Sequence, residues 1–460
     1  MSAVSPNPYV EVERLEQARS LGSGQLAADL RSAHRALALR AALAIGRTKL
    51  AAGIPLLRTR LHDPDPALRA MSVYGLGLIG TSYVQGDVLT ALVDRSQAVR
   101  LAAFDAANRL ETAKQFSKVN EASALRVLSY NLLRDRQALI RARAATAIEA
   151  FKDTAVAPEA ARDLSQAFKT ERDPNVRWHI MWTMFRSYAS REPRSQLLGA
   201  LRDSSELVRI EAVRALGRLK DPALVAHLEP LTRDPSWRAQ EQALESIRAL
   251  RKEPATEHLK ALPPGLHLPP MQTDRFAHLP AIAFPAPAGT PGPPSASNVI
   301  VAATQGPHPR LRIVTTKGNL YVELYPEWAP LTVENFMNLA SRGYYDNNPW
   351  FRIVPDFVVQ TGGGVDGNSD VKYTIGAEEN PLEQSSYVLS MGLNYTNPPD
   401  AHAIRDSAGS EWYITLSPQL HLNRDFTVFG RMIGGTDVLA RLIESDKIVR
   451  IERLSDAPTH

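Results

Sequence analysis

The chain has 460 residues, a formal net charge of +4 and no cysteine. This length predicts roughly two or three domains, each large enough to bury its own core. Without cysteine there are no disulfides, no thiolate catalysis and no cysteine-based zinc sites. Arginine is too dispersed along the chain to indicate a nucleic-acid partner, and no apolar run reaches the roughly eighteen residues of a membrane span.

The first residues, MSAVSPNPYVEVERL, lack the charged end and the apolar core of a signal peptide. A cysteine-free chain that opens on a polar, proline-containing segment suits the mature form of an exported, periplasmic bacterial protein. We hold this compartment as a hypothesis. A cytoplasmic protein is the alternative, because nothing in the sequence decides between the two.

The first half of the chain repeats one short phrase six times. Each copy has an Asp at a predicted turn, an Arg four or six residues later, and then an apolar stripe at helical spacing. The arginines recur at roughly thirty to forty residues, the period of a helical solenoid, and a degenerate seventh copy ends at Arg40. The six copies end at Arg69, Arg100, Arg141, Arg177, Arg209 and Arg238.

The chemistry of the phrase is local to each turn. Asp accepts hydrogen bonds from the free amide groups at a helix start, Pro is tolerated in the first turn, and the Arg pairs with an aspartate of its own or a neighbouring repeat. The pattern resembles HEAT repeats, which are helix pairs stacked into a superhelix. The resemblance implies an all-α solenoid over residues 1–252 whose concave face binds a protein partner. Because such Asp and Arg residues usually only hold repeats together, we nominate none of them for binding.

Residues 253–309 differ in composition and form a predicted linker. They hold 13 of the chain's 33 prolines, which excludes helix and favours stiff, extended chain. The segment NVIVAAT (298–304) is compatible with a strand, and the middle of the linker is more apolar than a free linker needs, at Phe276, Leu279, Ile282 and Phe284. We expect part of the linker to lie against one of the domains and to fix their relative orientation.

Residues 310–456 change to the alternating pattern of short strands. Helices are predicted near the start, in APLTVENFMNLASRGYYD, and near the end, in GTDVLARLIESD. The predicted strands are the two halves of LRIVTTKGNLYVELY around a Lys-Gly-Asn turn, then WFRIVPDFVVQ, SEWYITLS, TVFGRM and KIVRIERL. Many short strands with a helix near either end predict a closed barrel with helices over its openings.

One of these strands, WFRIVPDFVVQ, contains an arginine within an apolar run. A buried strand does not tolerate an unpaired charge. The guanidinium of Arg352 therefore either pairs with a neighbouring acid such as Glu411 or is directed at a ligand.

Five segments of this half carry a family resemblance in their order along the chain. They are GNLYVELYPEWAPLTVENFMNLASRGYYDN, WFRIVPDFVVQTGG, LSMG, AGSEWYITLS and LNRDFTVFGRM. Together they resemble the cyclophilin type of peptidyl-prolyl cis-trans isomerase from Leu311 to Leu454. The resemblance implies a mainly-β barrel that isomerises X-Pro bonds in polypeptide clients, a protein-folding activity that needs no metal and no cofactor.

The resemblance also implies a role for each matched residue. Arg352 donates to the prolyl nitrogen as the amide twists, Phe357 forms part of the pocket for the proline ring, and Gln360 holds a substrate carbonyl. The substrate-binding residues implied in the same way are Val358, Met391, Glu411, Tyr413, His421, Leu422 and Phe426.

The matched motifs also depart from the family's pattern at four positions. Phe351 stands where His precedes the catalytic Arg, Glu411 where a second pocket Gln is usual, His421 where Trp or Phe forms the pocket rim, and Phe426 where His is usual. A carboxylate at Glu411 would compete for Arg352. A catalytically weak or inactive peptide-binding scaffold therefore remains the alternative function, and a third interpretation makes the linker's own Ala-Pro and Gly-Pro bonds the ligand.

Two short motifs indicate other chemistry and are rejected. GGGVDG (362–367) fits the dinucleotide pattern, but no predicted helix follows it. DGNSD (366–370) begins like a calcium loop, but Val371 and Ala377 stand where that loop needs Gly and Glu. His402 is the one histidine of the long 392–409 loop, so we expect no zinc.

Overall fold

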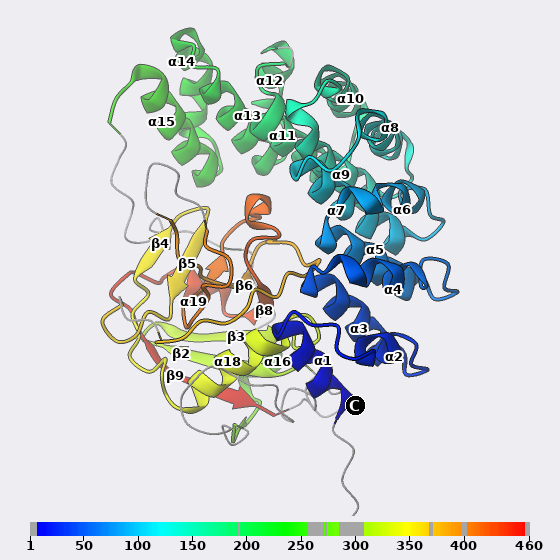
Figure 1. Ribbon diagram of the computed structural model, residues 1–460. Coiled ribbons are helices and arrows are strands. Elements are labelled where there is room, and N and C mark those ends of the chain that lie inside the picture. The colour runs from blue at the N-terminus through cyan, green and yellow to red at the C-terminus, as the bar shows by residue number, and fades with distance from the viewer. Residues whose placement is uncertain are drawn as a thin grey trace, which may run out of the picture. The chain divides into compact units, whose positions relative to one another are not determined.

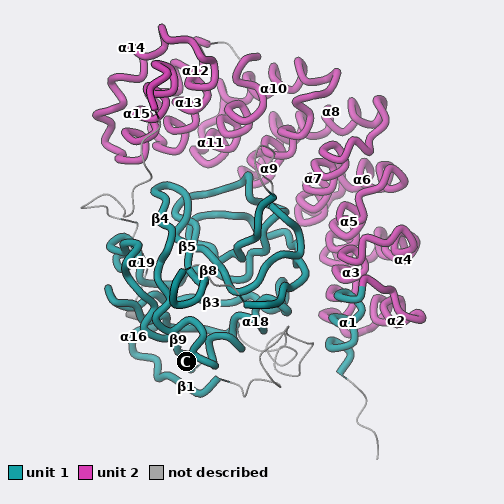
Figure 2. The backbone as a smooth tube through the Cα atoms, turned by 60° about the vertical axis from the view of Figure 1, so that its left-hand side comes forward, with its two compact units in different colours: residues 1–18, 258–460 teal, residues 19–257 magenta. Residues whose placement is uncertain are grey.

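The computed structural model describes residues 7–191, 194–254, 268, 271, 274–284, 308–367, 371–396 and 403–455. The chain forms two compact units, one of residues 19–257 and one of residues 258–460 with residues 1–18 (Figure 2). The N-terminal helix α1 (Pro8–Gln17) is grouped with the second unit. Within the described ranges, no helix combines the length and the apolar character needed to cross a membrane.

The first unit is a stack of helix pairs, which confirms the predicted α-solenoid (Figure 1). In each pair, a first helix leads through a turn into a second helix, and the second helices pack on one another in chain order. The pairs are α2 (Gln25–Leu30) with α3 (Arg35–Thr48), α4 (Ile54–Arg58) with α5 (Pro66–Ile79), α6 (Gln85–Ala91) with α7 (Gln97–Thr112), α8 (Lys118–Arg134) with α9 (Ala138–Ile148), α10 (Ala157–Thr170) with α11 (Pro174–Thr183), α12 (Arg194–Ala200) with α13 (Glu206–Arg218), and α14 (Val225–Leu228) with α15 (Trp237–Arg251).

Small residues allow the second helices to approach closely. A Cβ atom on Gly46 of α3 would lie 2.5 Å from the Cα of Gly75 in α5, closer than carbon atoms can pack. A Cβ atom on Gly77 would similarly lie 2.7 Å from the Cβ of Ala106 in α7. Glycine is therefore required where these helices cross.

The repeated arginines form a ladder that joins each repeat to the next. Each of these ladder arginines pairs with an acid, here called a ladder acid, in the turn of the following repeat. The pairs are Arg69–Asp94 (3.0 Å), Arg100–Asp135 (3.0 Å), Arg141–Glu171 (2.6 Å), Arg177–Asp203, and Arg209–Asp234 (2.7 Å). The predicted pairing between neighbouring repeats is thus confirmed.

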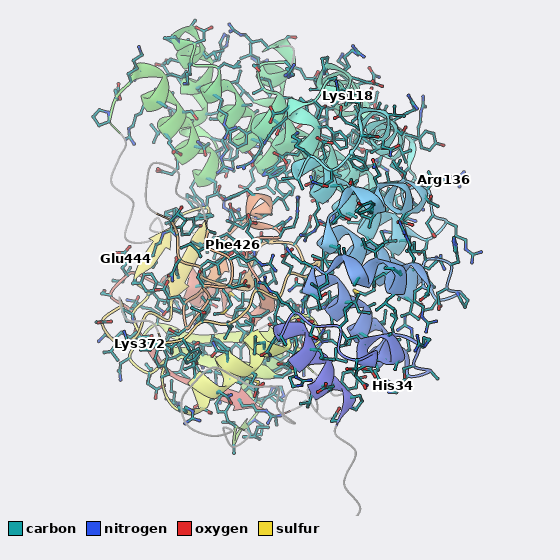
Figure 3. The ribbon with its side chains drawn as sticks, in the orientation of Figure 1. His34, Lys118, Arg136, Lys372, Phe426 and Glu444 are labelled. Carbon is teal, nitrogen blue, oxygen red and sulfur yellow. The ribbon has the colours of Figure 1, made fainter. Side chains whose placement is uncertain are left out.

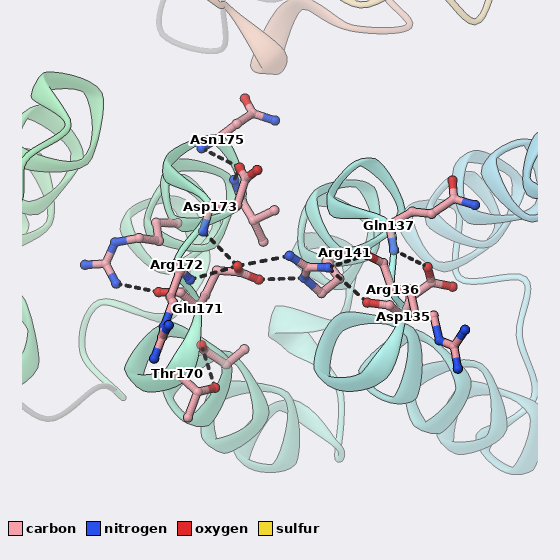
Figure 4. Close-up of polar contacts among 12 residues, drawn as sticks. Asp135, Arg136, Gln137, Arg141, Thr170, Glu171, Arg172, Asp173 and Asn175 are labelled. Carbon is pink, nitrogen blue, oxygen red and sulfur yellow. Dashed lines mark hydrogen bonds and ion pairs between the residues drawn. The ribbon is translucent and has the colours of Figure 1, made fainter.

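Each ladder residue also fixes its own turn. The Nη1 of every ladder arginine donates to the backbone carbonyl six residues earlier, and every ladder acid accepts from the backbone N–H two residues later. In Figure 4, Arg141 contacts Glu171 of the next repeat and, at 3.0 Å, the carbonyl of Asp135 in its own turn. One guanidinium thus sets both the shape of a turn and the stacking of two repeats.

The prediction that Arg238 is the last arginine of the ladder is wrong. Arg238 does not continue the ladder, because it points back to Glu206 of the preceding repeat at 3.4 Å. The equivalent position, six residues after Asp234, is Gln240, whose Nε2 donates to the Asp234 carbonyl at 2.5 Å. At the other end of the solenoid, Arg40 is buried within α3.

The second unit is built on one antiparallel sheet that curls around its core. The strand order is β1-β9-β2-β3-β8-β6-β7-β5-β4, and a bridge between Pro349 and Lys447 joins the chain just before β4 to the chain just before β9. The predicted barrel is confirmed, with helices α16 (Asp274–Ala277), α18 (Pro330–Ser341) and α19 (Thr436–Leu439). Its strands are β1 (Ala281–Ile282), β2 (Arg310–Thr315), β3 (Gly318–Leu324), β4 (Arg352–Val354), β5 (Val358–Thr361), β6 (Val388–Met391), β7 (Trp412–Thr415), β8 (Val428–Gly434) and β9 (Ile448–Leu454). The stretch WFRIVPDFVVQ, predicted as one strand, forms the antiparallel pair of β4 and β5, and β6 was not predicted.

Large aromatic side chains fill the centre of the barrel. Phe336 of α18 packs edge-on against Trp412 of β7, with ring centroids 5.4 Å apart, and Trp350 meets the same indole at 5.6 Å. Helix α18 starts at Pro330 as predicted, and its free amide groups at Leu331 and Thr332 donate to the buried carboxylate of Glu378. This core holds β4, β5 and β7 rigidly in place.

Part of the linker belongs to the barrel. The prediction that the linker contains no helix is wrong at one place, because the short helix α16 (Asp274–Ala277) lies within it. Strand β1 pairs antiparallel with β9, with Ala281 opposite Leu454. Leu279 is buried against Tyr321 and Leu454, and the Arg310 guanidinium lies 5.6 Å from the ring centre of Phe276. The expectation that part of the linker lies against a domain is therefore confirmed, while the predicted strand at 298–304 falls outside the described residues.

Candidate active site

The site is assembled on three adjacent strands. Arg352 is the first residue of β4 and lies opposite Gln360 of β5, which lies opposite Tyr413 of β7. Side chains alternate between the two faces of a strand. The intervening residues Ile353 and Val359 therefore point into the core, and this register brings the three polar side chains to the outer face.

A chain of hydrogen bonds connects the charged groups of this face. Nη1 of Arg352 donates to Oε1 of Gln360 at 3.2 Å, and Nε2 of Gln360 donates to Oε2 of Glu411 at 3.0 Å. The Gln360 amide is thereby oriented, with its oxygen toward the guanidinium and its nitrogen toward the carboxylate. The guanidinium itself stays exposed and lies 5.4 Å from the ring centre of Phe357.

An apolar cluster lies beside the guanidinium. Val358, Tyr413 and Leu422 are its buried members, and Phe357 and Phe426 pack against them half-exposed. The sequence nominated all five of these residues for the pocket, and the structure brings them together. Phe426 is labelled in Figure 3.

Aromatic contacts shape the cluster. The Tyr413 and Phe426 rings meet edge to face at 5.9 Å, which is a favoured geometry for aromatic pairs. His421, also nominated from the sequence, stacks on Phe357 with ring centroids 5.8 Å apart and an interplanar angle of 18°. His421 therefore extends the aromatic wall on the side of Phe357.

Two polar side chains, Gln384 and Ser390, form hydrogen bonds next to the apolar cluster. Nε2 of Gln384 donates to Oγ of Ser390 at 2.9 Å and to the backbone carbonyl of Phe426 at 3.3 Å. Ser390 lies opposite Tyr413 in the β6–β7 ladder. Burial raises the pKa of the Tyr413 phenol above its usual value. The Gln384 amide thus ties Ser390 of β6 to the backbone of Phe426.

One nominated residue lies elsewhere. Met391 is buried in the barrel core opposite Trp412, on the other face of β6 from Ser390. The LSMG motif could be matched to the family without saying which of its residues face outward. The alternation of strand β6 settles that Ser390 faces the cluster side and Met391 does not.

Two further residues adjoin the site and were missed in the sequence. A Cβ atom on Gly392 would lie 3.1 Å from Cβ of Glu411 and 3.5 Å from Nε2 of Gln360, so glycine leaves room for this pair. Tyr395 in the long loop meets the ring of Phe426 at 6.4 Å. Burial raises the pKa of Tyr395, and the nearby Arg352 guanidinium partly offsets that rise.

The dinucleotide-like motif GGGVDG (362–367) forms a turn in the structure. After Thr361, the glycines Gly362 and Gly364 adopt positive φ angles of 94° and 72°, and the chain turns without entering a helix. Residues 368–370 of DGNSD and His402 fall outside the described ranges. Among the described residues, no three His, Asp or Glu side chains gather in a way that would hold a metal ion.

Comparison with known proteins places both units. A family model described as cyclophilin type peptidyl-prolyl cis-trans isomerase/CLD matches residues 310–457. A model of HEAT repeats matches residues 25–108, 161–248 and 194–262.

Individual relatives match about a third of the chain. The chain is 40% identical over 136 residues to peptidyl-prolyl cis-trans isomerase B of Bacillus subtilis, covering 28% of this chain and 88% of that protein. It is 34% identical over 167 residues to peptidyl-prolyl cis-trans isomerase CYP18-2 of Arabidopsis thaliana, covering 35% and 92%. A crystal structure of a Cryptosporidium parvum cyclophilin type peptidyl-prolyl cis-trans isomerase shares 24% identity over 33% of this chain and 99% of its own, with a TM-score of 0.29.

Proposed function

This chain belongs to the cyclophilin-type peptidyl-prolyl cis-trans isomerases, and from that premise we propose that Arg352, Gln360 and the apolar cluster catalyse rotation about X-Pro bonds of polypeptide clients. The HEAT solenoid recruits those clients or anchors the enzyme. The observation that carries the proposal is an exposed guanidinium held by Gln360 beside an apolar cluster, which is the arrangement that a twisting prolyl amide requires.

The chemistry follows from amide resonance. Partial double-bond character gives the X-Pro bond a rotation barrier of about 18 to 20 kcal/mol, and unaided exchange takes tens to hundreds of seconds. As the amide twists, the lone pair becomes localised on the prolyl nitrogen. A donor placed there stabilises the twisted state more than the planar one, which is the requirement for catalysis. Arg352 is this donor, and no covalent step or cofactor is involved.

The other residues hold the substrate on either side of the twisting bond. The proline ring occupies the apolar cluster around Val358, Tyr413 and Leu422. One hydrogen of the Gln360 amide is used by Glu411, and the second remains for a carbonyl of the substrate. Gripping the ring while the preceding residue swings about it leaves the C–N bond as the one free rotation.

Glu411 supports a second candidate from another class. Its carboxylate shares the Gln360 amide, and this contact weakens the hold on a substrate carbonyl. In that case the barrel binds proline-containing segments without turning them, and the protein acts as a scaffold. Catalysis and binding must therefore be measured separately.

The test is exchange NMR of the full chain on a panel of short Ala-Pro and Phe-Pro peptides, with Arg352→Ala beside it. Removing one preorganised donor costs about 10²- to 10³-fold in rate, so the variant should lose nearly all exchange while still binding the peptides. Arg441→Ala is the control, because Arg441 is an exposed barrel arginine that pairs with Asp437 in α19. Peptide binding by the native chain without enhanced exchange would establish the scaffold and end the proposal.

A further inference from the structure

Exposed arginines recur in the turns of the solenoid, immediately beside the ladder acids. In five consecutive repeats, the residue directly before or directly after the ladder acid is an exposed arginine. We call these the turn arginines; they are Arg95, Arg134, Arg136, Arg172, Arg202 and Arg233. Arg136 and Arg172 lie in the two turns drawn in Figure 4, and Figure 3 labels Arg136 on the solenoid.

The turn arginines take no part in the ion pairs that join neighbouring repeats. Every ladder acid is already paired with a ladder arginine. Across residues 19–191 and 194–254, none of the ion pairs of the structure includes a turn arginine. The turns therefore carry a repeated arginine that makes no ion pair within the described solenoid.

The charge of the solenoid as a whole agrees with this. Residues 19–257 contain 37 Lys and Arg against 26 Asp and Glu, a net charge of +11, whereas the whole chain has only +4. The chain outside this unit is therefore net acidic, at −7. The mild overall charge conceals a strongly basic solenoid.

The turns lie along one edge of the stack, because each connects a first helix to a second helix and the second helices pack side by side. Packed helices lie about 8 to 10 Å apart, and an extended polypeptide advances about 3.3 Å per residue. One repeat therefore corresponds to roughly three residues of extended chain. Phosphates along a nucleic-acid strand follow one another more closely than the repeats do.

Apolar side chains are exposed at the same edge. Val93 directly precedes a ladder acid and is 66% exposed, Tyr130 lies one helical turn before Arg134 and is 68% exposed, and Leu139 follows Arg136 and is 45% exposed. Arginine and tyrosine are enriched at protein interfaces, and apolar side chains gain nothing against a phosphate backbone. The edge therefore suits a polypeptide better than a nucleic acid.

We propose that the turn arginines form a binding edge for an acidic polypeptide segment, extended along the solenoid with an Asp or Glu at about every third residue. This assigns a chemistry to the recruiting role given to the solenoid under the proposed function, but it does not depend on catalysis by the barrel. The ligand reaches the same edge whether or not it contains proline.

The test measures binding of the full chain to fluorescent peptides by anisotropy. The probe is a 21-residue peptide with Glu at every third position among Ala and Ser, and without proline. A peptide of the same composition with all Glu at one end tests the spacing, and a single-stranded 21-nucleotide RNA tests the competing class of ligand. Exchange NMR on a short uncharged X-Pro peptide is run in parallel, so that loss of catalysis and loss of recruitment are distinguished.

Two variants with equal loss of charge decide whether the edge itself is responsible. The first replaces Arg95, Arg136, Arg172 and Arg202 by Gln; the control replaces Lys118, Arg126, Arg162 and Lys169, exposed cations on α8 and α10, by Gln. The first variant should bind the spaced peptide at least tenfold more weakly, and the control should stay within about threefold of the native chain. Circular dichroism should show both folded, since none of the eight makes an ion pair within the described solenoid.

Equal weakening in both variants would show that only total charge counts and would overturn the proposal. Binding of RNA but not of the spaced peptide, or no binding of any peptide at low salt, would overturn it as well. Unchanged catalysis in the first variant, together with lost peptide binding, is the expected result.

Discussion

Replacement of Glu411 by Gln tests how this barrel differs from its family. In the structure, the Glu411 carboxylate holds Nε2 of Gln360 at 3.0 Å, and Gln360 in turn accepts from Arg352. The substitution keeps the size and the hydrogen-bonding ability of the side chain but removes its charge. Gly392 stays clear of the pair and leaves room for the new amide.

The substitution should change both the hydrogen bonding of Gln360 and the preference for charged substrates. A hydrogen bond to a charged acceptor contributes about 1 kcal/mol more than a neutral one, so the freed Gln360 amide should raise kcat/KM on an uncharged peptide by about fivefold. Glu411 precedes Tyr413 by two strand residues, about 7 Å along β7. A substrate side chain two residues from the bound proline therefore comes near the carboxylate, and a charge about 6 Å away in water interacts by about 0.7 kcal/mol.

The assay is exchange NMR on three peptides that differ only two residues before the proline, with Lys, Ala or Glu there. Attraction and repulsion together should favour Lys over Glu by about tenfold in the native chain, and Glu411→Gln should remove most of that preference. Asp437→Asn, which removes one exposed acid from α19, should leave it intact. The same Lys-to-Glu ratio in native chain and Glu411→Gln would refute the reasoning.

Three further predictions concern stability. Arg141→Ala should destabilise the α9–α11 segment by about 3 kcal/mol, because it leaves Glu171 half-buried without its cation; hydrogen exchange measures this, and a result equal to that of Arg136→Ala would contradict it. The guanidinium hydrogen bonds and backbone N–H groups outweigh burial and hold the pKa values of Asp94, Glu171 and Asp234 below their usual range. The three ionised carboxylates stabilise the folded solenoid fully above the unfolded pKa of about 4, and this stabilisation is lost as pH falls through the lower folded pKa values. The thermal midpoint of the helical circular-dichroism signal should therefore drop steeply below about pH 4. A midpoint unchanged between pH 5 and pH 3 would exclude this. Gly362→Ala should destabilise the barrel by at least about 2 kcal/mol, since φ is +94° and the new Cβ would lie 2.4 Å from the Ser410 carbonyl; near-UV circular dichroism in urea would show it, and a midpoint unchanged from the native chain would argue against it.

The repeats were largely predictable because their chemistry is local. An acid and an arginine six residues apart fix one turn, so the phrase recurs visibly in the sequence. The prediction assigned the wrong residue in two repeats, where capping the helix and pairing with the ladder are done by two different residues of the turn. At ERDPN, Asp173 caps α11 while Glu171 receives the ladder arginine, and in the last repeat Gln240 replaces the arginine while Arg238 points backward.

Site residues that belong to a family motif could be predicted from the sequence. The direction in which a side chain points could not, because it depends on the fold. Arg352, Phe357 and Gln360 follow from their motif, and the β4–β5 register places them on one face. The orientation of the Gln360 amide depends on Glu411, 51 residues away in the chain. Met391 and Ser390 are neighbours in one strand, and short apolar runs buried on both faces show no alternation that would separate them.

The pairing of β1 with β9 has a consequence for how this gene can be cut and recombined. The family's own boundary lies at residue 310, yet Ala281 and Ile282 cover the outer edge of the sheet and Leu279 seals Tyr321 beneath it. A fragment that begins at the family boundary would lack β1, so Arg453 and Leu454 of β9 would lose their partner strand and Tyr321 would lose its contact with Leu279. An unpaired strand edge is a template for self-association. The folding unit of this isomerase therefore starts upstream of the family's boundary, and an exchange of barrels between fusion partners should carry residues 279–282 along with the barrel.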